Sequence, residues 1–375
     1  MHSSTSSSEP PAAPAGRGRW PAAALAAVIL FFACEQALWR SPTWLRFCAR
    51  YAPPGAGDPV ITTARIRLLP ERAAAPPVLL LGSSQVREGL ACAAFEAALP
   101  GRPCANLAVG GGAPLDVLYV ARRTAAVWPR RVVVTGVFPK VLHMAPKAAF
   151  TDRATVACLL RGGAWRRMDA AAWLDIGYGL LGNVSETLRD REALRALSQT
   201  VGGHRRRAWR LELPAQPDRL LAGEPPRPDR YFDTRVGVVD FDTRPGTFTA
   251  VQEEALETVI RRETAAGNAM VVVDFPTRPG YETTLPPETV IHYRQFRGRL
   301  ARRADITLVR PEHLPPLDSS DFLDFTHLSS EGRGKVSRRL AEIVRAVAVS
   351  ELGVLRRTPQ TPRALRRSES GSRAA

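Results

Sequence analysis

The sequence predicts an α/β protein with a parallel five-stranded sheet, a helical insertion and an N-terminal transmembrane helix. From residue 78 onward, short apolar runs alternate with segments of helical periodicity, which is the pattern of strands joined by helical crossovers. The run Arg131–Val137 is apolar almost throughout, as a strand buried on both faces requires. We therefore expect three layers, with helices on both faces of the sheet.

Five strands and four helices follow along the chain. The strands are expected over residues 78–81, 105–108, 131–137, 269–276 and 306–309. The helices are expected over residues 86–99, 114–127, 289–302 and 330–349.

Residues 20–39 are predicted to form a membrane anchor. Their length is close to the ~20 residues that a helix needs to cross the hydrocarbon layer, and Trp20 and Trp39 suit its two interfaces. Glu35 and Gln36 lie in the last two turns, near an interface, where a polar group costs less than at the centre. No small-residue cleavage site follows, so an uncleaved anchor is favoured over a signal peptide. The alternative is a buried N-terminal helix. We expect the N-terminus in the cytoplasm and the large domain outside it.

The rest of the chain divides by composition. Residues 1–19 are rich in Ser, Pro and Ala and are expected to be disordered, and residues 40–76 form a Pro-rich linker. The main domain spans residues 77–350 and is interrupted over residues 145–245 by an insertion with helices expected around 153–161, 164–179 and 184–198. The insertion is either a cap near the active edge, facing substrate or membrane, or a packing layer of helices. Residues 351–375 form a basic tail that we expect to be disordered.

Charge and cysteine content narrow the classes of partner. The net charge of +16 comes almost entirely from arginine, which is spread along the chain together with 36 acidic residues. No nucleic-acid-binding motif accompanies it, so we expect no nucleic-acid partner. The five cysteines form no Cys-x-x-Cys or Cys/His cluster, and neither a metal nor another cofactor is expected. Cys92 and Cys104 either pair, if the domain is exported, or remain two buried thiols.

A serine and a distant Asp-His pair carry the predicted chemistry. Ser84 follows the first strand and precedes a helix, where backbone N–H groups can stabilise an oxyanion. Asp324 precedes His327 by three residues, a spacing at which the acid can orient the imidazole and the imidazole can act as base for a serine. Alternatives remain at this stage. Ser83 is a second candidate nucleophile, both serines are good helix caps, and Asp321 replaces Asp324 if Asp324 points away.

The order of these motifs resembles the SGNH/GDSL hydrolase superfamily over residues 77–137 and 269–350. That resemblance implies a flavodoxin-like α/β/α fold, with Ser84 of the segment Gly82–Gln85 as nucleophile and Asp324 and His327 as acid and base. It also implies an oxyanion hole formed by the backbone of Ser84 and by Gly111, which ends the pattern Asn-x-x-x-x-Gly. Ser83 occupies the position of the family's usual acidic residue.

The chain departs from the family pattern after the third strand. The family's Gly-x-Asn-Asp supplies an asparagine to the oxyanion, whereas residues 135–140 contain none. Removing one oxyanion donor typically costs about 10²–10³ in rate. Either Lys140 or a backbone N–H takes this role, or activity is low or lost. Arg278, after the fourth strand, is a second candidate contact for substrate; the alternative is an exposed, charge-balancing arginine.

With its N-terminal anchor and long insertion, the chain is similar to the membrane-attached subgroup that includes the D-alanyl transfer protein and the alginate O-acetylation proteins. This resemblance implies a serine esterase or O-acyltransferase acting on acylated envelope polysaccharide or a small ester, outside the cytoplasmic membrane. It also implies a membrane-bound acyltransferase as a partner. The rival hypothesis is a catalytically weak or inactive protein that keeps the fold to bind a polysaccharide or a partner acyltransferase.

Overall fold

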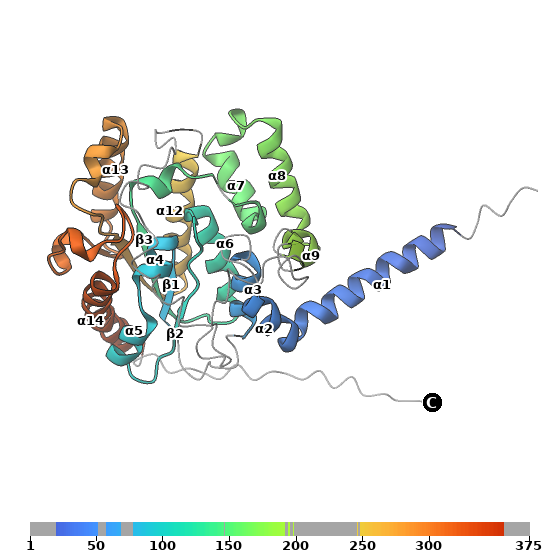
Figure 1. Ribbon diagram of the computed structural model, residues 1–375, viewed down its shortest axis with the longest axis horizontal. Helices are drawn as coiled ribbons and strands as arrows, with labels where there is room; N and C mark the ends of the chain where they lie inside the picture. The colour runs from blue at the N-terminus through green and yellow to red at the C-terminus, as the bar shows by residue number, and fades with distance from the viewer. Residues whose placement is uncertain are drawn as a thin grey trace, which may run out of the picture.

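The computed structural model describes residues 20–51, 58–68, 78–145, 147–191, 194–195, 198, 246 and 248–355. The described residues contain one five-stranded sheet with the order β2-β1-β3-β4-β5, and every pair of neighbouring strands is parallel. The strands are β1 (Val78–Leu81), β2 (Cys104–Asn106), β3 (Val132–Val137), β4 (Ala269–Asp274) and β5 (Thr307–Val309). The predicted α/β class and the five-stranded parallel sheet are therefore confirmed (Figure 1).

Alternate residues of each strand enter two separate apolar clusters, one on each face of the sheet. Leu79 and Leu81 pack into one cluster, whereas Val78 and Leu80 pack into the other. The first face is covered by α6 (Pro114–Ala125), α12 (Thr249–Ala265) and α13 (Pro287–Ala301). The second is covered by α4 (Ser84–Gly89), α5 (Cys92–Ala98) and α14 (Ser330–Leu355). The sheet is thus the middle of three layers.

The strand order places a topological switch point between β1 and β3. Helices α4 and α5 lead from β1 to β2 on one face, and α6 leads from β2 to β3 on the other. Because the two crossovers diverge, the carboxyl ends of β1 and β3 form the kind of place where open α/β sheets bind their ligands. Ser84, the first residue of α4, follows β1 at this place after a turn of two residues.

The helix predicted over residues 86–99 is divided into α4 and α5. Leu90 between them is extended, with φ −122° and ψ 134°. The Asn106 amide donates hydrogen bonds to the carbonyl oxygens of Val86 (3.2 Å) and Arg87 (3.1 Å) at the end of α4, and the Val86 oxygen also accepts the Leu90 backbone N–H (3.2 Å). The break between α4 and α5 is therefore stabilised by a side chain from β2, and this contact cannot be read from the helical periodicity.

Helix α12 was not predicted. Its buried residues include Val251, Ala255, Leu256, Val259 and Ile260, which recur at helical spacing and pack against the first face of the sheet. The helix therefore belongs to the helical layer on the first face of the sheet, and it leads the chain from the insertion to β4.

The insertion is helical where the structure describes it. Helix α7 (Arg153–Arg161) matches its predicted range, and its N-terminus is capped by Asp152. The segment predicted as one helix over residues 164–179 is a 3₁₀ turn followed by α8 (Ala170–Leu181), and α9 covers Glu186–Arg189. Several positions between residues 192 and 198, and all of 199–245, lie outside the described residues. The remaining 3₁₀ turns are η2 (Pro139–His143), η3 (Ala148–Phe150), η4 (Ala164–Arg166), η6 (Tyr281–Thr284), η7 (Pro311–His313) and η8 (Ser319–Asp321).

The N-terminal helix α1 (Trp20–Arg40) covers the predicted anchor and projects away from the body (Figure 1). In the described residues it is the one helix long and apolar enough to cross a membrane, by length and composition. Glu35, near its C-terminal end, is not left unpaired. One Glu35 carboxylate oxygen accepts hydrogen bonds from the Ser185 hydroxyl (2.6 Å) and the Thr187 backbone N–H (2.7 Å), so the end of α1 is held by α9.

The predicted linker over residues 40–76 contains two helices that the sequence analysis did not identify, α2 (Pro42–Tyr51) and α3 (Asp58–Leu68). Their buried side chains form a small cluster with Trp39. Arg65 on α3 is buried and donates to the carbonyl oxygen of Asn106 at 3.1 Å. The segment predicted as a linker therefore packs against the sheet domain.

Cys92 and Cys104 form a disulfide, with 5.2 Å between their Cα atoms. This settles the alternative left open by the sequence, and it ties the start of α5 to the start of β2. At the other end of the chain, α14 continues to Leu355, into the predicted tail 351–375. The disorder predicted for residues 1–19 and for the tail beyond residue 355 lies outside the described residues.

Candidate active site

The turn after β1 exposes one serine and buries the other. Gly82 has φ +149°, and a Cβ there would lie 2.7 Å from the Val86 side chain, so the close packing of this turn requires glycine. Ser83 is buried, and its hydroxyl donates to the Gln85 side chain. Ser84 is half-buried at the first position of α4. Of the two candidate serines, Ser84 therefore faces the site.

The Ser84 hydroxyl, the His327 imidazole and the Asp324 carboxylate form a continuous hydrogen-bonded chain. His327 Nε2 lies 2.9 Å from Ser84 Oγ, and His327 Nδ1 lies 2.7 Å from Asp324 Oδ2. In this arrangement a proton on Nδ1 is held by the carboxylate, and Nε2 is placed to accept the serine proton. All three residues of the predicted catalytic set are thus brought together.

A closed loop fixes the acid and the base. Phe322 and Leu328 form an antiparallel bridge, and the Leu323 N–H donates to the His327 carbonyl oxygen at 2.8 Å. Inside the loop, Asp324 Oδ1 accepts the backbone N–H groups of Thr326 (2.7 Å) and His327 (2.8 Å). One carboxylate oxygen therefore anchors the backbone while the other orients the ring.

The surroundings of Asp324 keep it ionised. Burial alone would raise the pKa of this carboxyl, but the hydrogen bond and charge of His327 and the two backbone N–H donors lower it on balance. Burial and the Asp324 charge raise the pKa of Tyr281, whose ring lies 6.1 Å from that of Phe325 between their centroids. Tyr281 was not singled out in the sequence, since no motif links it to the Asp-His segment.

Asp321, the alternative acid, has another partner. Its Oδ1 lies 2.8 Å from Lys335 Nζ, and its Oδ2 accepts the Asp318 backbone N–H at 3.1 Å. It therefore holds the start of α14 to the preceding loop. Asp324 is the residue that orients His327.

The other described histidines lie elsewhere. His143 Nδ1 is 2.9 Å from Thr249 Oγ1, and His292 Nε2 is 3.3 Å from a carboxylate oxygen of Glu253. His313 Nδ1 accepts the Arg310 backbone N–H at 3.2 Å. His2 and His204 lie outside the described residues.

The glycine loop after β2 lies against the end of β1. The Val109 N–H donates to the Gly82 carbonyl oxygen at 2.9 Å, and a Cβ on Gly112 would lie 3.1 Å from that same oxygen. Gly111 has φ +62°, in the left-handed region that favours glycine. The loop that carries Gly111, the predicted oxyanion residue, is thus hydrogen-bonded to Gly82, which lies two residues before Ser84.

A buried carboxyl holds this loop from behind. Asp116 Oδ2 accepts the Ala113 N–H at 2.8 Å, and Asp116 Oδ1 accepts the Lys147 N–H at 3.1 Å. Burial raises the pKa of Asp116 to about 7, against the opposing effect of the hydrogen bonds and of Lys147. This residue was not identified from the sequence, although its place three residues after Ala113 is that of a helix-capping acid.

Lys140 and Arg278 border the triad from β3 and β4. Lys140 lies in η2 and is half-buried; burial lowers the pKa of its ammonium, while the charge of Asp324 acts in the opposite direction. The Arg278 backbone N–H donates to the Phe325 carbonyl oxygen at 2.9 Å, which joins its loop to the Asp-His loop. The Arg278 guanidinium makes no hydrogen bond or ion pair with any residue that the structure describes. No asparagine occupies the segment after β3.

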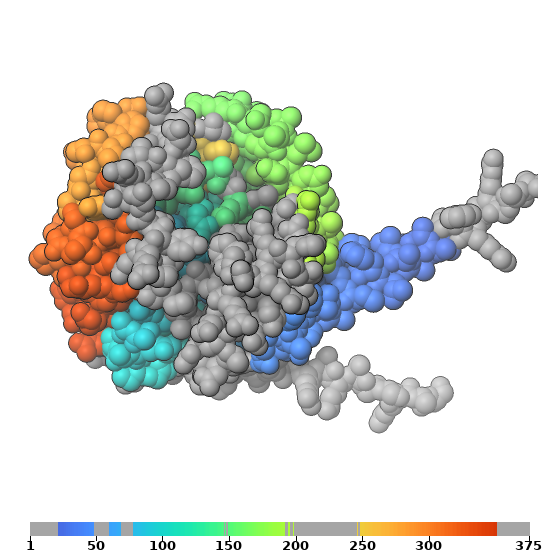
Figure 2. Space-filling model, viewed as in Figure 1, coloured from blue at the N-terminus to red at the C-terminus, as the bar shows by residue number. Residues whose placement is uncertain are grey.

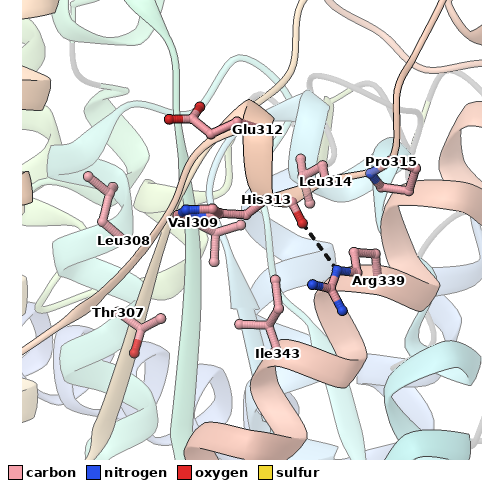
Figure 3. Close-up of a pocket in the computed structure, with 9 residues that line it drawn as sticks. All are labelled: Thr307, Leu308, Val309, Glu312, His313, Leu314, Pro315, Arg339 and Ile343. Atoms are coloured by element: carbon pink, nitrogen blue, oxygen red, sulfur yellow. Dashed lines mark hydrogen bonds between the residues drawn. The ribbon is translucent and has the colours of Figure 1, made fainter.

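Two hollows are lined by none of the three triad residues. One of about 210 Å³ beside β4 is lined by five prolines and by Asp274, whose carboxylate is satisfied by Tyr293 (2.6 Å) and Arg297 (2.8 Å). A larger one of about 500 Å³ lies beside β5, where Arg339 donates to the His313 carbonyl oxygen at 3.1 Å (Figure 3). Over the described ranges, no three His, Cys, Asp or Glu side chains are grouped to hold a metal ion.

Neither protein-family models nor curated proteins match the sequence. The assignment of a function therefore depends on the positions of the side chains themselves.

Proposed function

We propose that the protein is a membrane-anchored, SGNH-like serine esterase or O-acyltransferase. The observation that carries this proposal is the hydrogen-bonded chain from Ser84 Oγ through the two ring nitrogens of His327 to Asp324. Its position at the switch point of the sheet, with a helix N-terminus at the serine, supports an acyl-transfer role.

The mechanism follows from these positions. His327 Nε2 accepts the Ser84 proton as Oγ attacks an ester carbonyl, and the imidazolium then returns the proton to the leaving alcohol. The backbone N–H groups of Ser84 and Gly111 are the proposed oxyanion donors, and Lys140, in the segment after β3, is the candidate replacement for the missing asparagine. Water, or a sugar hydroxyl, then attacks the acyl-enzyme with His327 as base, which releases the acid or a new ester.

The location and the substrate class are proposed from two features. Helix α1 has the length and composition of a membrane span, and a Cys92–Cys104 disulfide is typical of an oxidising compartment. These features favour a domain on the extracytoplasmic side, where acylated envelope polysaccharides and small esters are the accessible substrates. A membrane-bound acyltransferase is the partner that would supply or receive the acyl group.

One observation favours a second function. The segment after β3 lacks the asparagine that completes the oxyanion hole in the family that the sequence resembles. A loss of about 10²–10³ in rate is the expected consequence if nothing replaces it. A catalytically weak protein that binds a polysaccharide or a partner acyltransferase is the alternative.

Ester turnover by the full-length protein in detergent distinguishes the two. The enzyme releases p-nitrophenol from p-nitrophenyl acetate in an initial burst followed by slower turnover, and Ser84→Ala abolishes both phases. Ser83→Ala, which removes the buried neighbouring hydroxyl, retains the burst. Equal release by the wild type and Ser84→Ala would refute the enzymatic assignment.

A further inference from the structure

Exposed apolar side chains are concentrated in two places. Among the described residues, sixteen large hydrophobic side chains are exposed, and six of them lie on α1. Eight more lie on the insertion between residues 160 and 188, and the other two, Ile291 and Val349, lie on separate helices. Six of the eight belong to α8, α9 and the turn between them, and we call them the α8–α9 face: Trp173, Leu174, Tyr178, Leu181, Val184 and Leu188.

Helix α8 turns an apolar stripe outward. Leu174, Tyr178 and Leu181 recur at the spacing of one helical face, and all three are exposed, whereas Ile176 and Gly179 on the opposite side are buried. The helix has 12 residues, too few to cross the ~30 Å hydrocarbon layer. A short helix that is apolar on its outward face is suited to lie along a membrane surface.

The α8–α9 face adjoins the membrane helix. Trp39 near the end of α1 donates its indole N–H to Thr187 Oγ1 at 3.1 Å, and Glu35 accepts hydrogen bonds from Ser185 and Thr187 of the α9 segment. Leu188 follows Thr187 directly, so exposed apolar surface continues from α1 through α9 to α8. Figure 1 shows α8 and α9 on the side of the body from which α1 projects, and Figure 2 shows their surface beside the C-terminal end of α1, where that helix meets the body.

The composition of the face favours lipid over a protein partner. Trp173 and Tyr178 are the aromatic types enriched at membrane interfaces. The Arg191 guanidinium lies 4.5 Å from the centroid of the Tyr178 ring, where a cation can reach lipid phosphate while the ring lies deeper. Asp169 and Asp175 are the acidic residues of this helix; Asp169 caps its N-terminus through the Ala172 N–H.

We propose that the α8–α9 face lies in the headgroup layer of the bilayer that α1 crosses. The insertion then holds the domain against the membrane at a second place, and the anchor and the α8–α9 face fix its orientation. This inference is independent of the chemistry proposed for Ser84. It concerns only where the domain lies when α1 is inserted.

Photolabelling from lipid tests the proposal. The full-length protein is reconstituted into phosphatidylcholine vesicles with a minor fraction of phosphatidylglycerol and a diazirine-bearing phospholipid, and labelled peptides are identified by mass spectrometry. Label is expected on α1 and on peptides covering residues 170–188. The peptide that carries Ile291, which is 56% exposed on α13, is the internal control and is expected to remain unlabelled.

Two variants complete the test. Leu174→Asp with Leu181→Asp is expected to reduce label on residues 170–188 severalfold while label on α1 is unchanged, and Ile291→Asp is expected to leave the pattern as in the wild type. Circular dichroism checks that both variants fold. Label confined to α1, or equal label on the Ile291 peptide, would overturn the proposal.

Discussion

Ser84 Oγ and His327 Nε2 lie 2.9 Å apart although 243 positions separate the two residues in the sequence. They meet because α4, which begins at Ser84, and α14, which begins three residues after His327, pack in one apolar cluster on the same face of the sheet. The geometry of this candidate site therefore depends on the packing of this layer as well as on the three polar residues.

Replacing the orienting acid should reduce activity more than it reduces stability. Asp324→Asn leaves one oxygen for the backbone N–H groups but replaces the acceptor of the His327 Nδ1 proton with a donor. We expect kcat to fall by about 10²–10⁴-fold, because the ring takes the wrong tautomer. Asp321→Asn is the control: it breaks the contact with Lys335, so it lowers the unfolding temperature but leaves kcat within about twofold. Equal losses of kcat in the two variants would contradict the assignment of Asp324.

The conformation of Gly111 should matter for catalysis. Gly111→Ala places a side chain at φ +62°, where the neighbouring Met144 and Lys147 atoms leave room, so the penalty is backbone strain of about 1 kcal/mol. We expect a similar loss of stability in Gly101→Ala, at φ +79° with open space around it, and a fall in kcat only in Gly111→Ala. Kinetics and chemical denaturation of both variants measure this. An unchanged kcat in Gly111→Ala would remove the loop from the oxyanion hole.

Asp116 should make stability depend on pH. Its pKa is raised from 3.8 to about 7 by burial, so between these values the folded protein binds a proton that the unfolded chain has released. The contribution of Asp116 to the free energy of unfolding therefore decreases as the pH rises from about 4 to about 7 and is constant above that. Relative to Asp116→Asn, the wild type should lose stability over this range. Denaturation at a series of pH values measures the difference, and parallel curves would contradict it.

The disulfide should stabilise the α5–β2 connection. Closing a loop with a sequence separation of 12 contributes about 3 kcal/mol. Cys92→Ala with Cys104→Ala should lose about this amount and become insensitive to reductant, whereas the wild type loses it when dithiothreitol is added. Cys158→Ala, which removes a buried free thiol, should retain the response to reductant. A wild type unaffected by reductant would indicate that the bond contributes nothing.

The sheet and the proximity of Ser84, Asp324 and His327 could be predicted because local signals specify them. The runs at Val78–Leu81 and Val132–Val137 are apolar on both faces, so their periodicity identifies buried parallel strands. The same reasoning places Ser84 at the carboxyl edge of the sheet. The spacing of Asp324 and His327 is short enough for one loop to set their geometry. That loop then has only to lie near the end of β1 for His327 to reach Ser84.

The remainder depends on contacts between distant segments. The break at Leu90 is stabilised by Asn106 from β2, and the choice between Ser83 and Ser84 depends on which hydroxyl the turn buries. Similarly, Glu35 was expected to be tolerated near an interface, whereas Ser185 of the insertion supplies its partner. Helix α12 is a different case, since the spacing of its apolar residues was a sufficient signal and the preceding long interval obscured it.

Covalent labelling of the full-length protein with a fluorophosphonate, followed by identification of the modified peptide, tests the central claim most directly. A serine activated by His327 should react at Ser84 alone, and the reaction should be lost in Ser84→Ala and slowed strongly in His327→Ala. An unlabelled protein, or label on Ser83 or a serine outside the turn after β1, would contradict the account.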